Sequence, residues 1–136
     1  MDKKSNNWLE EAEWDFENAK ILLKNKRYNT VVFHPQQAAE KALKSLLYFN
    51  NINGWGHSIF TLLEKYKELK KLDLDDLSRY ALNLDKHYIT TRYPDALPDL
   101  APHNAYTNQE AKIAIEQADK LIQFVKKEIE KGKKDE

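Results

Sequence analysis

The sequence predicts an all-α protein, folded as an antiparallel up-down bundle of four to five helices. Apolar residues recur at alternating three- and four-residue steps along five segments, the spacing of helices that are buried on one side. The chain has 136 residues with only 3 glycines and 4 prolines, which argues against a β-rich or disordered chain. Short connections favour antiparallel neighbours. We expect a single helical domain over residues 1–136, with a disordered tail from about residue 131.

The first helix is expected from Asn7 to Lys24. Its apolar stripe consists of Leu9, Ala12, Phe16, Ala19 and Leu23. Trp14 and Ile21 lie seven residues apart on nearly the opposite face, where a small bundle has little reason to expose a tryptophan. Aligned exposed apolar residues often mark an interface, and two-fold dimers are the commonest assembly. We therefore expect a homodimer with Trp14 and Ile21 in the interface.

The second helix is expected to end near Asn50, and it has two distinct faces. The buried stripe is Val32, Pro35, Ala39, Ala42, Leu46 and Phe49, and the opposite face carries Gln36, Gln37, Glu40, Lys41 and Lys44. This polar face can bind a polar ligand or a second copy of itself, or it is a solvated face with ordinary i,i+4 pairs. Pro35 removes one backbone hydrogen bond. Either the helix bends there or residues 28–34 form a separate first turn.

The remaining helices follow from their start signals. Ser58 is expected to cap the third helix, whose buried face is Ile59, Leu62, Leu63, Tyr66 and Leu69. The fourth begins at Asp73 or Asp75 and ends before Pro94, because the residue preceding a proline avoids helical angles. Thr107 and Glu110 form a capping box that opens the last helix. We expect His57 to order the turn before the third helix by satisfying open backbone groups.

A long loop from Tyr93 to Tyr106 holds the candidates for chemistry. Arg92 either complements the end of the fourth helix or binds a phosphate together with Tyr93 and Asp95. His103 and Tyr106 lie at the far end of the loop, and with Arg92 they are candidate catalytic groups for cleaving a phosphodiester. Asp95, Asp99 and His103 are four residues apart, but the intervening prolines forbid the helix that a metal site would need. We predict no metal and no cofactor.

Composition narrows the function further. Twenty-two basic and twenty-two acidic residues cancel, so unselective nucleic-acid binding through net charge is not indicated. With no cysteine there is neither a disulfide nor a thiolate nucleophile. No apolar run has the length of a signal peptide or a membrane span. We expect a cytoplasmic protein that has no membrane partner.

Four sequence features resemble HEPN domains. They are the Gln36-Gln37-Ala38-Ala39-Glu40-Lys41 segment followed by Lys44, an acidic first helix with Asp15, the Gly56-His57-Ser58-Ile59 start of the third helix, and Arg92-Tyr93-Pro94-Asp95. They occur in the family's order and cover residues from about Trp8 to Val125. The resemblance implies a helical bundle and a polar dimer cleft for nucleotides or RNA, formed by Gln37, Glu40, Lys41, Lys44 and Arg92. It also implies a minimal nucleotidyltransferase as a partner in a toxin–antitoxin-like pair.

The resemblance leaves two alternatives to this binding module. Many HEPN proteins resemble metal-independent ribonucleases, whose signature is an arginine and a histidine separated by four to six residues. Here Arg92 and His103 are separated by ten residues, so we expect the protein alone to be a poor ribonuclease. The other alternative is a purely structural dimerisation module, against which the polar face and the Arg92 loop both count.

Overall fold

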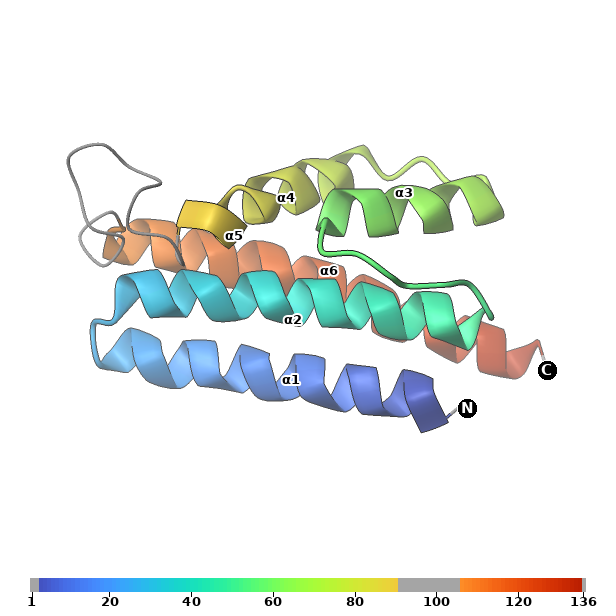
Figure 1. Cartoon of the computed structure of the whole chain (residues 1–136), viewed down its shortest axis with the longest axis horizontal. Coiled ribbons are helices and arrows are strands. Elements are labelled where there is room, and N and C mark those ends of the chain that lie inside the picture. Colours follow the sequence, from blue (N-terminus) through green and yellow to red (C-terminus); the bar gives the residue numbers. More distant parts are fainter. Residues whose placement is uncertain (1–2, 91–105, 136) are drawn as a thin grey trace.

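The computed structural model describes residues 3–90 and 106–135, and within these ranges the chain is helical without strands. The all-α bundle predicted from the sequence is confirmed (Figure 1). A single turn, α5 (His87–Thr90), follows the fourth helix. The longer helices are α1 (Lys3–Lys24), α2 (Tyr28–Phe49), α3 (Ile59–Lys70), α4 (Asp75–Asp85) and α6 (Asn108–Lys134).

The central element of the bundle is α2, which packs against α1, α3 and α6. Figure 1 shows α1 along one side of it and α6 behind it. Its apolar side chains are buried on more than one side of the helix axis: Val31, Val32, Ala38, Ala39, Ala42, Leu43, Leu46 and Leu47. A helix surrounded in this way cannot leave its polar face fully in water, so part of that face is buried.

Pro35 lies inside a continuous α2, so residues 28–34 are the first turns of that helix and not a separate element. Proline has no backbone N–H and therefore breaks one link of the helical hydrogen-bond ladder. The helix continues because its side chains are buried on both sides of Pro35, with Val31 and Val32 before it and Ala38 and Ala39 after it. Tertiary packing thus outweighs the local cost of the proline.

The connection from α2 to α3 runs back along α2 instead of turning directly into an antiparallel neighbour. A Cβ atom on Gly54 would lie 3.2 Å from the Tyr48 ring and 3.3 Å from Lys44, and His57 lies beside Glu40, one further turn back. Figure 1 shows this segment crossing the front of the bundle before α3 begins, so that α3 runs in the same direction as α2. The return segment, residues 50–58, therefore covers part of the polar face of α2.

Two side chains cap the start of α3. Ser58 accepts a hydrogen bond from the Thr61 backbone N–H at 3.1 Å, as the sequence predicts. Asp85, at the end of α4, accepts hydrogen bonds from the Ile59 N–H at 2.7 Å, the Phe60 N–H at 3.0 Å and the Ser58 hydroxyl at 2.9 Å. A carboxylate at a helix N-terminus satisfies open donors and complements the helix dipole. Asp85 thereby fixes α3 against α4.

Some of the other predicted boundaries differ in the structure, since α1 begins at Lys3 instead of Asn7, and the fourth helix ends at Asp85 and is followed by the separate turn α5. The capping box of Thr107 and Glu110 is formed, and the predicted buried stripe of α3 holds up to Tyr66, with Leu69 exposed. The expectation of a disordered tail from about residue 131 is not met, because α6 continues to Lys134. Gly132 lies so close to the Phe49 ring that a Cβ atom there would collide with it. This close packing holds the last turns of α6 against the end of α2.

Removing the Asp85 carboxylate should destabilise the fold. Asp85→Ala leaves two backbone donors at the start of α3 without partners, so we expect the free energy of unfolding to fall by about 1–3 kcal/mol. Urea denaturation followed by circular dichroism measures this change. Asp76→Ala on the same helix is the control, because Asp76 pairs with the exposed Arg79 and an exposed pair of this kind contributes little. Equal midpoints for Asp85→Ala and the parent protein would contradict this account of the cap.

Candidate functional site

The polar face of α2 forms a largely buried network of hydrogen bonds and ion pairs. Gln37 donates a hydrogen bond to Gln36 at 2.6 Å, and Gln36 lies 3.4 Å from the Glu40 carboxylate. Gln36, Glu40 and Lys44 are all buried, while Gln37 and Lys41 are partly exposed. The structure therefore brings together the predicted residues Gln37, Glu40, Lys41 and Lys44, but not as a solvated helix face.

The first half of this network is centred on Asp15 of α1. Its Oδ2 atom lies 2.7 Å from the Lys41 Nζ, and its Oδ1 atom lies 3.6 Å from Nδ1 of His34. Burial by itself raises the pKa of Asp15, but the contacts with His34 and Lys41 outweigh that effect and leave the pKa below its ordinary value of 3.8. Asp15 is therefore held ionised between α1 and α2.

The second half is centred on Glu40. Its Oε2 atom lies 3.4 Å from the Lys44 Nζ and 3.5 Å from Nδ1 of His57 in the return segment. The His57 ring also packs against Tyr88 of α5, with 5.4 Å between the ring centres. Each of the two buried carboxylates thus contacts one lysine and one histidine. We call these two clusters the Asp15 cluster and the Glu40 cluster.

His57 differs from its neighbours because it reaches solvent. Its side chain is 66% exposed, whereas the Glu40 side chain that it contacts is 5% exposed. The expectation that His57 satisfies the backbone at the start of α3 is wrong, because Ser58 and Asp85 bind those groups. A cavity of about 220 Å³ lies beside the ring, lined by His57, Ser58, Asp85 and Tyr88.

Aromatic rings continue the network toward the start of α1. The Lys44 Nζ lies 5.0 Å from the Trp8 ring centre, and Trp8 stacks on Tyr48 at 6.3 Å. The ammonium group of Lys4 lies 4.1 Å from the centre of the Tyr48 ring. Cation–π contacts of this kind fix lysine side chains without neutralising them. Lys44 is consequently held on two sides, by Glu40 and by Trp8.

The predicted loop residues divide into two groups. Arg92, Tyr93, Asp95 and His103 lie outside the described residues. Tyr106 is buried, and its hydroxyl lies 3.0 Å from Nδ1 of His87. Burial lowers the pKa of His87 to about 4, so this histidine is neutral at pH 7. Among the described residues, the candidate catalytic Tyr106 is therefore paired with His87 of α5.

The two predicted interface residues are exposed on α1. The Trp14 side chain is 65% exposed and that of Ile21 is 57% exposed. Both lie away from the face that α1 presents to α2, where Ala12, Asp15 and Ala19 are buried. Trp14 and Ile21 are therefore accessible to a second chain, as the predicted interface requires.

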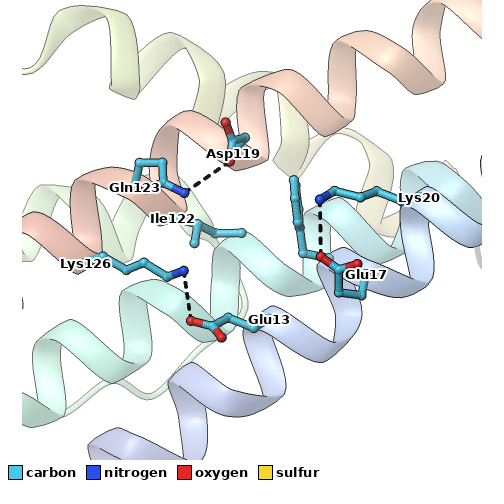
Figure 2. Close-up of a pocket in the computed structure, with 8 residues that line it drawn as sticks. Glu13, Glu17, Lys20, Asp119, Ile122, Gln123 and Lys126 are labelled. Carbon is cyan, nitrogen blue, oxygen red and sulfur yellow. Dashed lines mark hydrogen bonds and ion pairs between the residues drawn. The ribbon is translucent and has the colours of Figure 1, made fainter.

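A different groove lies between α1 and α6, and several of its polar side chains contact one another. Figure 2 shows that Glu13 of α1 meets Lys126 of α6, at 3.0 Å, and that Lys20 contacts Glu17 at 3.2 Å. On α6, Gln123 donates to Asp119 at 3.4 Å. The groove measures about 220 Å³. Exposed ion pairs of this kind contribute little energy.

Comparison with known proteins now gives the family. The HEPN domain family matches residues 5–129, which is nearly the whole chain. This protein belongs to the HEPN family. The resemblance found in the sequence is thus confirmed, and the buried network of α2 is the structural setting of the segment that carried much of it.

Two solved structures share the fold of this HEPN domain over most of their length, and a third relative matches it in sequence. TT1696 from Thermus thermophilus is 38% identical, with a TM-score of 0.89, covering 93% of this chain and 99% of that one. ST0689, described as an archaeal HEPN homologue, is 36% identical with a TM-score of 0.79, covering 94% and 99%. The "Putative toxin MJ1304" of Methanocaldococcus jannaschii is 30% identical over 127 residues, or 88% of this chain and 84% of that protein.

Sequence reasoning predicts Lys41 as a site residue but does not place Asp15, His34 or His57 in this network. Asp15 occupies the buried stripe of α1 between Ala12 and Ala19, and an acid at such a position is itself a signal of a buried partner. His34 and Lys41 are seven residues apart on α2, so a shared partner could have been predicted. The position of His57 beside Glu40 could not, because it depends on the path of the return segment.

The described residues contain neither a helix suited to cross a membrane nor a cluster of side chains suited to hold a metal ion. No helix in residues 3–90 and 106–135 is long and apolar enough to cross a membrane. Within the same ranges, no group of three or more histidine or acidic side chains is arranged to hold a metal ion.

Asp15 should make the stability of this HEPN domain sensitive to acid. Its pKa in the folded state lies below the ordinary value, so its stabilisation is fully present above about pH 4 and is lost as the pH falls through the folded-state value. Asp15→Asn should lower the free energy of unfolding at pH 7 by about 2 kcal/mol, because Lys41 loses its partner.

Urea denaturation from pH 7 to pH 2.5 tests this expectation. The parent should lose more stability than Asp15→Asn over the acid part of that range, so that the two curves converge. Asp119→Asn is the matched control and should follow the parent, because Asp119 accepts a hydrogen bond from the neutral Gln123 and pairs with no buried cation among the described residues. Parallel curves for Asp15→Asn and the parent would show that Asp15 is not held ionised by the fold.

Proposed function

We propose that this HEPN domain is a dimeric module that binds a nucleotide or RNA through its phosphates at the polar face of α2. The observation that carries the proposal is that the polar face of α2 contacts two buried carboxylates, Asp15 and Glu40, each paired with a lysine of that face. Burying charged groups costs several kcal/mol per ion, so such networks often mark binding or catalytic sites. We further propose that Arg92, Tyr93 and Asp95 complete this site.

We also infer that the protein is the HEPN half of a toxin–antitoxin-like pair with a minimal nucleotidyltransferase. The relative that bears the name of a toxin supports the toxin-like role, since it covers most of this chain at 30% identity. A cytoplasmic location follows from this proposal, because RNA and nucleotides are the ligands. We do not favour the ribonuclease alternative, because in the described residues Tyr106 is buried against His87.

Arg92→Ala should weaken ligand binding at least about tenfold, because a charge-assisted hydrogen bond to phosphate contributes roughly 1.5–3 kcal/mol. Thermal stability should remain nearly unchanged. Titration calorimetry with ATP and with a short single-stranded RNA measures the affinities. Lys112→Ala removes an exposed cation from α6 and serves as the control. Failure of the parent protein to bind either ligand would remove the proposed function.

Trp14 and Ile21 should hold the dimer together. Light scattering at micromolar concentration is expected to give about twice the 16.0 kDa of one chain. Replacing both residues by glutamate should return a folded monomer, because apolar contact is exchanged for charge repulsion. Trp55→Glu is the matched control, since Trp55 is also exposed but lies on the return segment. A monomeric parent protein would overturn the dimer proposal.

A further inference from the structure

We propose that His57 is the residue of the Glu40 cluster that contacts the anionic group of the ligand, and that the cavity beside it is the subsite for that group. This inference rests on the nucleotide- or RNA-binding function proposed above, and it names the contact that such a function requires. The cavity of about 220 Å³ is lined by His57 and Tyr88, together with Ser58 and Asp85.

The lysines of the same face are already engaged. Lys41 lies 2.7 Å from Asp15, and Lys44 lies 3.4 Å from Glu40 as well as over the Trp8 ring. If either lysine turned toward a phosphate, a largely buried carboxylate would be left without its cation, which costs more than an exposed contact returns. The two lysines therefore compensate the two acids and do not supply the charge for a ligand.

His57 has the opposite arrangement, because it is fixed at one side and open at the other. Its Nδ1 atom lies 3.5 Å from Glu40, and its ring packs against Tyr88, yet the side chain is 66% exposed. With Nδ1 directed at Glu40, the second ring nitrogen, Nε2, is left to face a ligand. An imidazole held by a carboxylate in this way presents Nε2 in a defined direction.

Protonation of His57 would give this face its positive charge. Asp15 with Lys41 and Glu40 with Lys44 sum to zero, so a charge on His57 would not be cancelled by these four groups and would strengthen the attraction for anions. Of the groups that face His57, Glu40 comes from α2, Tyr88 from α5 and Asp85 from α4. The Asp85 carboxylate accepts three hydrogen bonds at the start of α3, which compensate its charge. Anion binding should therefore strengthen as the pH falls.

His34 is the other histidine of this face, but it is not placed to contact a ligand. Its side chain is 19% exposed, and its buried Nδ1 atom has no hydrogen-bond partner among the described residues. It lies against Asp15, on the side of the network that α1 covers. The two histidines can therefore be separated experimentally, since both belong to an acid-centred cluster but His57 is far more exposed than His34.

The test measures RNA binding as a function of pH. The probe is an eight-nucleotide single-stranded RNA without a terminal phosphate, labelled for fluorescence anisotropy. Its phosphodiesters keep one charge each from pH 5.5 to pH 8.0, whereas a phosphate monoester has a pKa near 6 and would add its own pH dependence. The affinity of the parent protein should rise on the order of tenfold from pH 8.0 to pH 5.5.

Three variants assign the effect. His57→Gln should bind weakly at every pH, because the ring that becomes charged is gone. His57→Lys carries a permanent charge, so it should bind more tightly than His57→Gln and without the pH dependence. His34→Gln should retain the pH dependence of the parent. Circular dichroism melting of each variant shows that it is folded at the pH of the measurement.

The outcomes distinguish the role of His57 from the RNA-binding function itself. If the parent binds RNA equally at every pH and His57→Gln matches it, the role of His57 is overturned and the proposed binding function stands. If His34→Gln loses the pH dependence and His57→Gln keeps it, the subsite is likewise refuted. If the parent binds no RNA at any pH, the proposed RNA-binding function fails together with the inference built on it.

Discussion

The architecture depends on the burial of α2 along almost its whole length. Once α1, α6 and the return segment surround this helix, its polar side chains can be tolerated only if each meets a partner of opposite charge or a hydrogen bond. Asp15 of α1 meets Lys41, and Glu40 meets Lys44 within α2 itself. These contacts determine which face of α1 lies against α2, because a rotated α1 would leave the partly exposed Lys41 without its acid and bury Asp15 without its cation.

Polar contacts also fix α1 against α2 near the start of α1. The Ser5 hydroxyl donates to the Ser45 carbonyl at 2.7 Å, and the Ser45 hydroxyl donates to the Ser5 carbonyl at the same distance. Apolar packing alone permits small sliding motions between two helices, whereas reciprocal hydrogen bonds and a buried ion pair each fit one register. The two helices are therefore fixed by polar contacts at two separate points, while their alanines provide the close approach between them.

Much of the fold, but less of the site, could be predicted from the sequence. Helical periodicity and the Ser58 and Thr107 caps are local signals, and the structure agrees with them. The cap from Asp85, the burial of Glu40 and the position of His57 depend on the path of residues 50–58, which no local signal encodes. The continuation of α6 depends likewise on the contact of Gly132 with Phe49. The predicted roles of Arg92 and His103 stay predictions, since both lie outside the described residues.

The burial of α2 also explains what the family resemblance can and cannot indicate. The segment from Gln36 to Lys44 supplied much of the resemblance, and its charged members are mainly occupied with one another and with α1. Residues of this kind specify the packing of the bundle, so relatives can share them whatever they bind. Differences in ligand should instead arise where the network reaches solvent. Among the described residues of the Glu40 cluster, the side chain that reaches solvent is His57. Under the proposed function, the recognisable core of this HEPN domain and its binding specificity are thus carried by different side chains.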